Sequence, residues 1–263
     1  MSTVSIVRGR SAVEHSLLVI ERILRDREGI WQQIRTEYQL NALISQMSAS
    51  SALSFVCYGL VLGFSNLKYP LEQALASAVK LPLLFFLTLA ICLPTLYLFN
   101  LLFGARLSVR QALAIVLVAI TVTAALTLAF APISLFFLIT APNHAFSKIL
   151  NVAILMLTGC VGLKFLISGM RSMNQMALVE QVAGHTEPAD EDRGDADRRS
   201  PVTRRPVSMG LLNIWIILYA FVGTQLAWTL RPFFGDPGKV VLFRAIEGNF
   251  YVDVVHTLLR LFK

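Results

Sequence analysis

The chain has 263 residues, of which 56% are hydrophobic and 15% are charged, and its mean hydropathy is +0.65. Soluble globular domains carry about 25% charged residues, so this composition excludes an ordinary water-soluble enzyme. The net charge of +7 comes from basic residues that flank apolar stretches, as membrane orientation and anionic head groups require, so nucleic acid is not an expected partner. The sequence predicts an all-α, polytopic transmembrane helix bundle.

Residues 1–39 mix basic and acidic side chains and lack the continuous apolar stretch of a secretory signal. Their apolar residues recur at spacings of three, four or seven, which predicts an amphipathic helix. These residues are Val13, Leu17, Ile20, Leu24, Trp31 and Ile34. We expect this segment to lie along the inner membrane face or against a partner.

Five charge-poor stretches are long enough to cross a bilayer. They are Leu40–Asn66, Leu81–Ala105, Gln111–Ser147, Ile149–Met170 and Pro206–Leu230. The third is too long for one straight helix, and we expect a kink near Pro132, where a backbone hydrogen bond is lost. A span followed by a short re-entrant segment is the alternative. The domains expected are therefore spans one to four within 40–170 and the fifth span at 206–230.

Between the last two spans, residues 171–205 are predicted to form a flexible cytoplasmic linker. Its portion 187–205, EPADEDRGDADRRSPVTRR, cannot bury apolar surface. The acidic run lacks the spacing of a calcium-binding loop, so no metal is expected there.

The basic residues predict the orientation of the chain. With five spans, fifteen of the 23 Lys and Arg residues fall on the side of the N-terminus, and eight fall on the other side. Cytoplasmic loops carry the excess of Lys and Arg. We therefore expect a multi-pass protein of the inner (plasma) membrane, with a cytoplasmic N-terminus and an external C-terminus.

Small residues within the spans indicate close helix packing, because they let two backbones approach. The predicted packing residues are Gly59, Gly63, Gly159, Gly162, Gly223 and Ala227. The face that carries Gly59 and Gly63 is expected to pack inside the bundle, although packing against another chain is the alternative. Pro94 is expected to kink the second span.

No residue pattern in the spans points to catalysis or to a cofactor. The three cysteines lie in three different spans without CxxC spacing, so neither a zinc nor a redox site is expected. No histidine, aspartate or glutamate lies in a span core, which argues against an intramembrane protease. Lys164 is the one ionisable candidate, and its long side chain is expected to snorkel to the interface. Asn151 is expected to bond a neighbouring helix.

The tail 231–263 follows Trp228, an interfacial anchor. Its stretch 250–262 predicts an amphipathic interfacial helix. Arginine beside aromatic residues is typical of interface hot spots, so 231–251 is the predicted external partner-binding surface. The residues concerned are Arg231, Phe233, Phe234, Phe243, Arg244, Glu247, Phe250 and Tyr251. Self-docking of the tail onto the bundle is the alternative.

Two of these regions carry a family resemblance. The run 80–104, KLPLLFFLTLAICLPTLYLFNLLFG, resembles the second span of bacterial Yip-like membrane proteins, and 223–235 with 243–251 resemble the end of an uncharacterised branch of that group. The similarity covers roughly residues 40–260. It implies five spans and a cytoplasmic N-terminus. The acidic-aromatic motif of the eukaryotic members is not present, so their binding of small GTPases is not carried over.

Together these features predict a non-enzymatic membrane scaffold or an accessory subunit of a larger assembly. The expected partners are membrane lipids and other membrane protein subunits. A small permease or channel component is the alternative.

Overall fold

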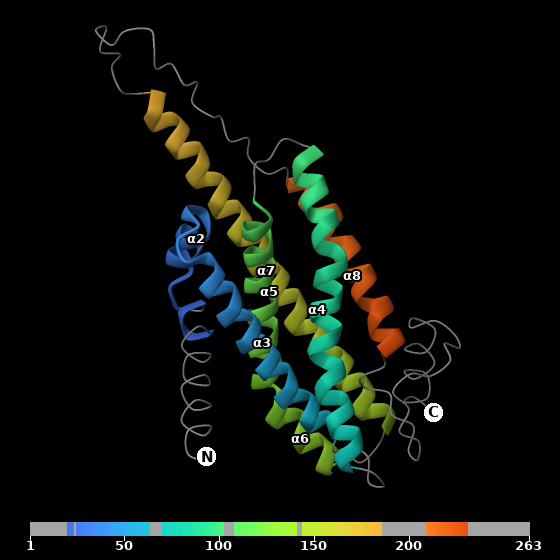
Figure 1. Ribbon diagram of the computed structural model, residues 1–263. Coiled ribbons are helices and arrows are strands. Elements are labelled where there is room, and N and C mark those ends of the chain that lie inside the picture. Colours follow the sequence, from blue (N-terminus) through green and yellow to red (C-terminus); the bar gives the residue numbers. More distant parts are fainter. Residues whose placement is uncertain are drawn as a thin grey trace, which may run out of the picture.

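The computed structural model describes residues 20–23, 25–63, 70–102, 108–140, 144–185 and 209–230, and every regular element within these ranges is helical (Figure 1). Five stretches in them are long and apolar enough to cross a membrane, so the prediction of an all-α, five-span bundle is confirmed. These stretches are Leu40–Gly63, Gln73–Leu98, Val109–Thr140, Phe146–Ser172 and Asn213–Leu230.

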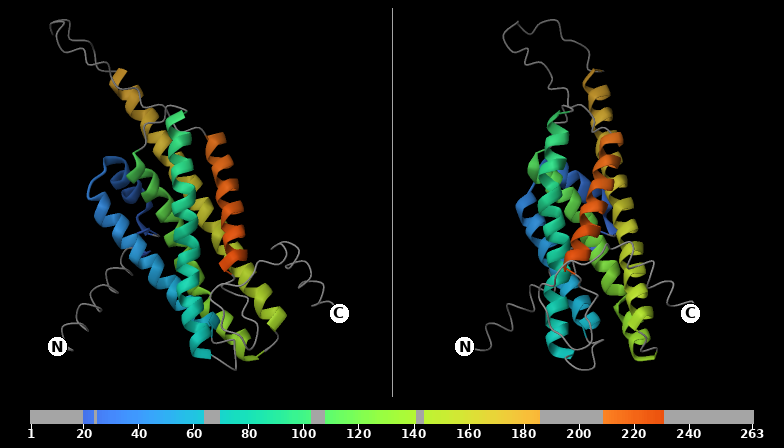
Figure 2. Two further views of the ribbon diagram at one scale, coloured as in Figure 1. Left: turned by 45° about the vertical axis from the view of Figure 1, so that its right-hand side comes forward. Right: turned by 90° about the vertical axis from the view of Figure 1, so that its right-hand side faces the viewer.

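The first two spans, α3 (Leu40–Gly63) and α4 (Pro70–Leu102), lie side by side (Figures 1 and 2). The apolar part of α4 begins at Gln73, eight residues before the predicted start of the second span. Lys80 marked that predicted start, yet the helix continues through this charge. A single charge therefore does not end a helix, because a lysine near the end of a span can extend its amine to the interface. Both Pro82 and Pro94 lie within the continuous α4.

The third span consists of α5 (Val109–Ala129) and α6 (Ala131–Thr140). At its start, the Ser108 hydroxyl accepts from the Gln111 backbone N–H, and the Gln111 side chain accepts from the Ser108 N–H, which is a capping box. The helix is interrupted at Phe130, two residues before Pro132. Because proline cannot donate to the carbonyl four residues earlier, the interruption is expected there. The two helices form one apolar stretch, Val109–Thr140, as the prediction of a kinked span requires.

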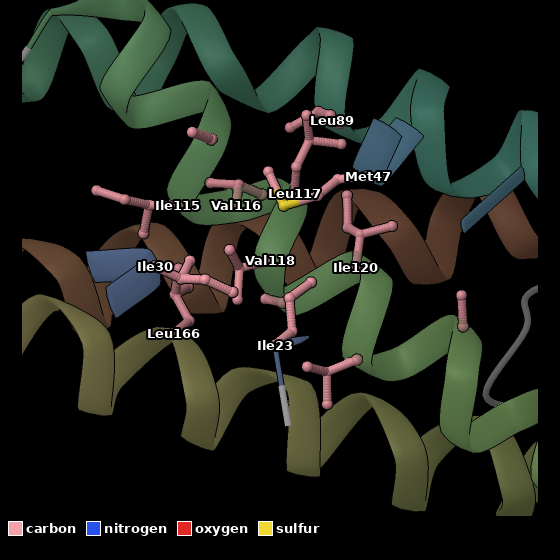
Figure 3. Close-up of a cluster of buried hydrophobic side chains, with 14 of the residues drawn as sticks. Ile23, Ile30, Met47, Leu89, Ile115, Val116, Leu117, Val118, Ile120 and Leu166 are labelled. Atoms are coloured by element: carbon pink, nitrogen blue, oxygen red, sulfur yellow. The ribbon is translucent and has the colours of Figure 1, made fainter. Parts of the chain in front are cut away.

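Helix α5 occupies the centre of the bundle and packs mainly against α3 on one side and α7 on the other. Nearly every residue from Gln111 to Ala124 is buried. Figure 3 shows the cluster around α5, to which α2, α3, α4 and α7 also contribute side chains. The labelled residues of these helices are Ile115, Val116, Leu117, Val118 and Ile120 of α5, with Ile30 of α2, Met47 of α3, Leu89 of α4 and Leu166 of α7. The small and β-branched residues of α5 allow neighbouring helices to approach it closely from several directions.

Helix α7 (His144–His185) extends past the predicted end of the fourth span at Met170. Residues 171–185 were expected to belong to a flexible linker, and this part of the prediction is wrong. A helix satisfies its own backbone hydrogen bonds, so it can continue into water after the apolar stretch ends. Figure 2 shows α7 projecting beyond the other helices. The remainder of the predicted linker, 186–205, lies outside the described residues.

The last described helix, α8 (Met209–Leu230), packs mainly against α4 at the edge of the bundle (Figure 2). Only 17% of its most apolar window is buried, compared with 67% for the third span. The N-terminal segment contributes α2 (Arg27–Thr36), which Asp26 caps by accepting from the Gly29 N–H. The expected continuous amphipathic helix is thus interrupted at Asp26, and residues 1–19 lie outside the described part of the chain.

Candidate functional site

A buried polar cluster joins three helices near the end of the bundle where α6 lies. The Tyr58 hydroxyl of α3 donates to Asn151 Oδ1 of α7 at 2.9 Å, and the Ser134 hydroxyl of α6 donates to the same oxygen at 2.8 Å. Tyr58 is fully buried, and the other two residues are each 5% exposed. One amide oxygen therefore satisfies two hydroxyls that would otherwise be costly to bury. As expected, Asn151 bonds neighbouring helices.

Further along the same interface, threonines connect α5 and α7. The hydroxyls of Thr127 and Thr158 lie 3.0 Å apart, and Thr123 Oγ1 donates to the Thr158 carbonyl at 3.5 Å. Thr121 similarly reaches the Met47 carbonyl of α3 at 3.4 Å. Most of these hydroxyls also bond a carbonyl of their own helix, so they remain satisfied inside an apolar core.

These polar groups are hydroxyls and one amide, and their chemistry is hydrogen bonding. Nothing in this arrangement positions an acid or a base next to a nucleophile. Within the ranges that the structure describes, no group of three or more His, Cys, Asp or Glu lies close enough together to hold a metal ion. The cysteines are free thiols at separate places: Cys57 is half-buried, Cys92 is buried and Cys160 is exposed. The network therefore fixes the relative positions of α3, α5, α6 and α7.

Two of the predicted packing glycines lie at the closest helix contact. A Cβ at Gly59 would lie 2.7 Å from the Ser77 carbonyl oxygen and 2.8 Å from Ala78 Cα, and a Cβ at Gly63 would overlap the backbone of Ala74. The GxxxG face of α3 therefore packs inside the bundle, against a second small-xxx-small pair, Ala74 and Ala78, on α4. Backbone contact of this kind requires glycine.

The other predicted packing residues differ from one another. A Cβ at Gly162 would overlap the Thr123 side chain and lie 2.7 Å from the Ala119 carbonyl oxygen, so this glycine permits the close approach of α7 to α5. Gly223 faces Thr88 at an ordinary 3.6 Å. A Cβ at Gly159 would meet no atom within 4 Å, so the predicted packing role of Gly159 is wrong. Ala227 is half-buried on α8.

Helix α2 is anchored to the bundle at both of its ends. At its start, an Arg27 guanidinium nitrogen lies 2.9 Å from Ser168 Oγ of α7, and the guanidinium carbon lies 4.5 Å from the centre of the Phe165 ring. In the middle, the Trp31 ring fills the space above Gly169. We call these five residues, all on α2 and α7, the α2 dock. Three apolar side chains of α2 are buried: Ile30, Trp31 and Ile34.

At the other end of α2, Gln111 closes the helix. Its Nε2 donates to the carbonyl oxygens of Ile34 and Arg35 at 3.3 and 3.1 Å. The last carbonyls of a helix lack donors from a following turn, and a side chain from α5 supplies donors here. The Ile34 carbonyl accepts from the Glu37 N–H as well. Gln111 thus serves both the capping box of α5 and the C-terminus of α2, and it is 5% exposed.

Helix α8 is held to α4 by one buried indole. Trp215 Nε1 donates to the Cys92 carbonyl oxygen at 2.9 Å, and Trp215 is 1% exposed. Its ring lies 5.3 Å from that of Tyr219.

Lys164, the ionisable candidate from the sequence, is exposed on α7. The eight predicted partner-binding residues, together with the C-terminal amphipathic helix, lie outside the described residues. They are Arg231, Phe233, Phe234, Phe243, Arg244, Glu247, Phe250 and Tyr251.

The sequence did not predict that Gln111 bonds both α5 and α2, nor that the α2 dock forms. It also did not predict that Asn151 accepts hydrogen bonds from two helices. The S-x-x-Q pattern of Ser108 and Gln111 is a capping-box signal that could have located the start of α5. Lys80 is half-buried inside the second span, whereas the prediction from charge begins that span one residue later.

Comparison with known proteins identified no relative: no family model matches the chain, and neither a curated protein nor a solved structure is significantly similar to it. The resemblance to Yip-like proteins is therefore neither supported nor contradicted.

Proposed function

We propose that this chain is a non-enzymatic scaffold or accessory subunit of a larger membrane protein assembly. We place it in the inner (plasma) membrane with its N-terminus in the cytoplasm and its C-terminus outside. The observation that carries the proposal is the position of α5, whose residues are buried almost without interruption from Gln111 to Ala124. A bundle with a packed helix at its centre has its outer surfaces available for binding.

The position of the polar residues within the spans also favours this function over a permease or channel component. Carriers and channels direct intramembrane ionisable groups toward the bundle interior or a water-filled cavity. Lys164 is exposed on α7, and Gln225 is half-buried on α8, the helix at the edge of the bundle. Lys80 is half-buried, but it lies near the start of the apolar stretch of α4, where its amine can extend to the interface. The buried hydroxyls between α5 and α7 bond one another or backbone carbonyls, so they serve packing.

The outer surface of α4 is the binding surface that we favour among the described helices. Large apolar side chains recur on it at every fourth position and are between 39% and 69% exposed. They are Leu71, Leu75, Val79, Leu83, Leu87 and Ile91. Residues four apart are neighbours on a helix surface but advance by about 40° at each step, so these six form a continuous apolar stripe that winds around α4. In a membrane such a stripe contacts lipid chains or a helix of another subunit. The external stretch 231–251 remains our predicted second surface.

Photo-crosslinking in native membranes tests the proposal. A photoreactive phenylalanine derivative would replace Leu83 or Leu87 on the exposed stripe, and Leu84 or Leu89, which are 6% and 5% exposed, would be the matched buried controls. We expect the exposed positions to give discrete crosslinks to other membrane proteins, identified by mass spectrometry, and the buried positions to give none.

Two results together would refute the scaffold function. One is the absence of any crosslinked or copurifying membrane protein for all exposed positions. The other is solute or ion flux carried by the purified chain alone in proteoliposomes, which would establish the permease alternative.

A further inference from the structure

The exposed face of α7 changes character along the helix. Its exposed residues recur at spacings of three or four, and the first of them are apolar or weakly polar: Ala153, Met156, Leu157 and Cys160. The next are polar or basic: Lys164, Ser168, Arg171 and Gln175. Because residues three, four and seven apart share one side of a helix, a single surface passes from an apolar half to a basic half within one turn, between Cys160 and Lys164.

A second helix adds a positive charge to the basic half. The Arg27 guanidinium of α2 lies 2.9 Å from Ser168 Oγ and is held over the Phe165 ring. Ser168 Oγ accepts this hydrogen bond, which leaves the hydrogen of its own hydroxyl unused by it. The hydroxyl can therefore donate to a further oxygen atom. This places a hydroxyl donor between the basic side chains of Lys164 and Arg171.

The acidic residues near this surface do not neutralise it. In the described ranges, neither Lys164 nor Arg171 has a carboxylate within 4.0 Å. Asp26 keeps its charge while it caps α2, and Glu21 pairs with Arg25. Glu28, next to Arg27 in the chain, is the remaining nearby carboxylate and is exposed. Among the described residues, the three basic side chains Arg27, Lys164 and Arg171 therefore outnumber Asp26 and Glu28, the two carboxylates that flank Arg27 in the chain.

We propose that Arg27, Lys164, Ser168 and Arg171 bind the phosphate of an anionic phospholipid, with an acyl chain lying along the apolar half of the same α7 face. Lys164 and Arg171 are separated by about 10 Å along the helix axis, with Ser168 between them. The Arg171 side chain leans toward the helix N-terminus and so toward Ser168, and the long Lys164 side chain extends toward the interface and so toward Ser168 as well. Guanidinium and ammonium groups are the usual ligands of phosphate oxygens.

The apolar half distinguishes a lipid from a soluble phosphate. A free phosphate would need only the basic residues, whereas the exposed Met156 and Leu157, at 71% and 54%, continue the surface in the direction of the acyl chains. Basic clusters at the membrane interface attract anionic lipids by about fivefold in affinity per basic residue. This inference goes beyond the scaffold proposal and does not depend on which protein partner the chain has.

Native mass spectrometry of the full chain in detergent micelles tests the site. The probes are phosphatidylglycerol, phosphatidylcholine with the same acyl chains, and inorganic phosphate. We expect the wild type to bind phosphatidylglycerol more tightly than phosphatidylcholine. The pair Lys164→Gln with Arg171→Gln should weaken phosphatidylglycerol binding about 25-fold, and Arg171→Gln alone should weaken it about fivefold.

The matched control pair is Arg110→Gln with Lys148→Gln, which removes the same charge elsewhere: Arg110 is near the opposite end of α2 from Arg27, and Lys148 is at the other end of α7. This pair should leave binding within about twofold. The charge-preserving pair Lys164→Arg with Arg171→Lys should also bind as the wild type does, which separates loss of the site from loss of the fold.

Three outcomes would overturn the proposal. The first is an equal loss of binding in the control pair, which would indicate a general charge effect. The second is unchanged binding in the glutamine pair. The third is displacement of phosphatidylglycerol by inorganic phosphate at equal concentration, which would identify a site for soluble phosphate.

Discussion

From the contact between α3 and α4 we predict how the stability of the protein changes when alanine replaces glycine at different positions in the spans. At Gly59 the new Cβ would lie 2.7 to 2.9 Å from three backbone atoms of Ser77 and Ala78, closer than the 3.0 Å below which something must shift. Backbone atoms cannot rotate away as a side chain can, so α3 and α4 would have to move apart. At Gly159 the same methyl group would meet nothing within 4 Å.

The expected magnitudes follow from two opposing terms. Alanine favours a helix interior by about 1 kcal/mol relative to glycine, and an extra methyl forced into a packed contact costs about 1–3 kcal/mol. Gly159→Ala should therefore be neutral or stabilise by up to about 1 kcal/mol, whereas Gly59→Ala, where the packing cost opposes this gain, should destabilise by up to about 2 kcal/mol. Gly63→Ala, with the deeper backbone overlap, should also destabilise, and Gly223→Ala should behave like Gly159→Ala.

Reversible unfolding of the full chain in mixed micelles of a mild detergent and sodium dodecyl sulfate measures these differences. Because Gly59, Gly159 and Gly223 lie inside their helices, the intrinsic helix term is common to these three variants, whereas Gly63 is the last residue of α3. If Gly59→Ala were as stable as Gly159→Ala, the backbone contact between α3 and α4 would not exist as described, and the reasoning would be refuted.

Three other predictions concern the polar contacts and the topology. Asn151→Ala should destabilise by about 1–3 kcal/mol, because two buried hydroxyls lose their acceptor, and a double-mutant cycle with Tyr58→Phe should give a coupling of about 0.6–1.7 kcal/mol; additive effects would contradict the shared bond. Gln111→Ala should accelerate amide hydrogen exchange at the end of α2 near Ile34 and Arg35, and unchanged protection would argue against the cap. A cysteine introduced at position 195 should be labelled from the cytoplasm and one at 240 from outside; labelling of both from one side would break the five-span topology.

The five spans were predictable because the length and apolarity of a helix that crosses a bilayer are local properties of the chain. The ends of the helices were harder to predict from the sequence than the number of spans. The predicted second span began too late at Leu81, because composition set its limit. The predicted end of the fourth span at Met170 lies two residues before the end of the apolar stretch at Ser172, but α7 itself continues to His185. A backbone that satisfies its own hydrogen bonds continues through Lys80 and beyond Arg171 without regard to charge.

The sequence also located the small residues, but their partners depend on the tertiary structure. Gly59, Gly63 and Gly159 are all small residues within spans, but a Cβ at Gly59 or Gly63 would meet the backbone of α4, whereas a Cβ at Gly159 would meet no atom within 4 Å. The helical period in the sequence predicts which residues share a face of one helix. Which other helix packs against that face depends on how the whole bundle packs.

By itself, the amino-acid sequence therefore determined the class of the protein, the number of spans and the interrupted third span, because these follow from local hydropathy and proline chemistry. Only the tertiary structure decided that α5 occupies the centre, that Gln111 closes α2 and that Asn151 accepts from Tyr58 and Ser134. Each of these contacts joins residues between 17 and 93 positions apart, and most of them meet only because several helices pack together at once.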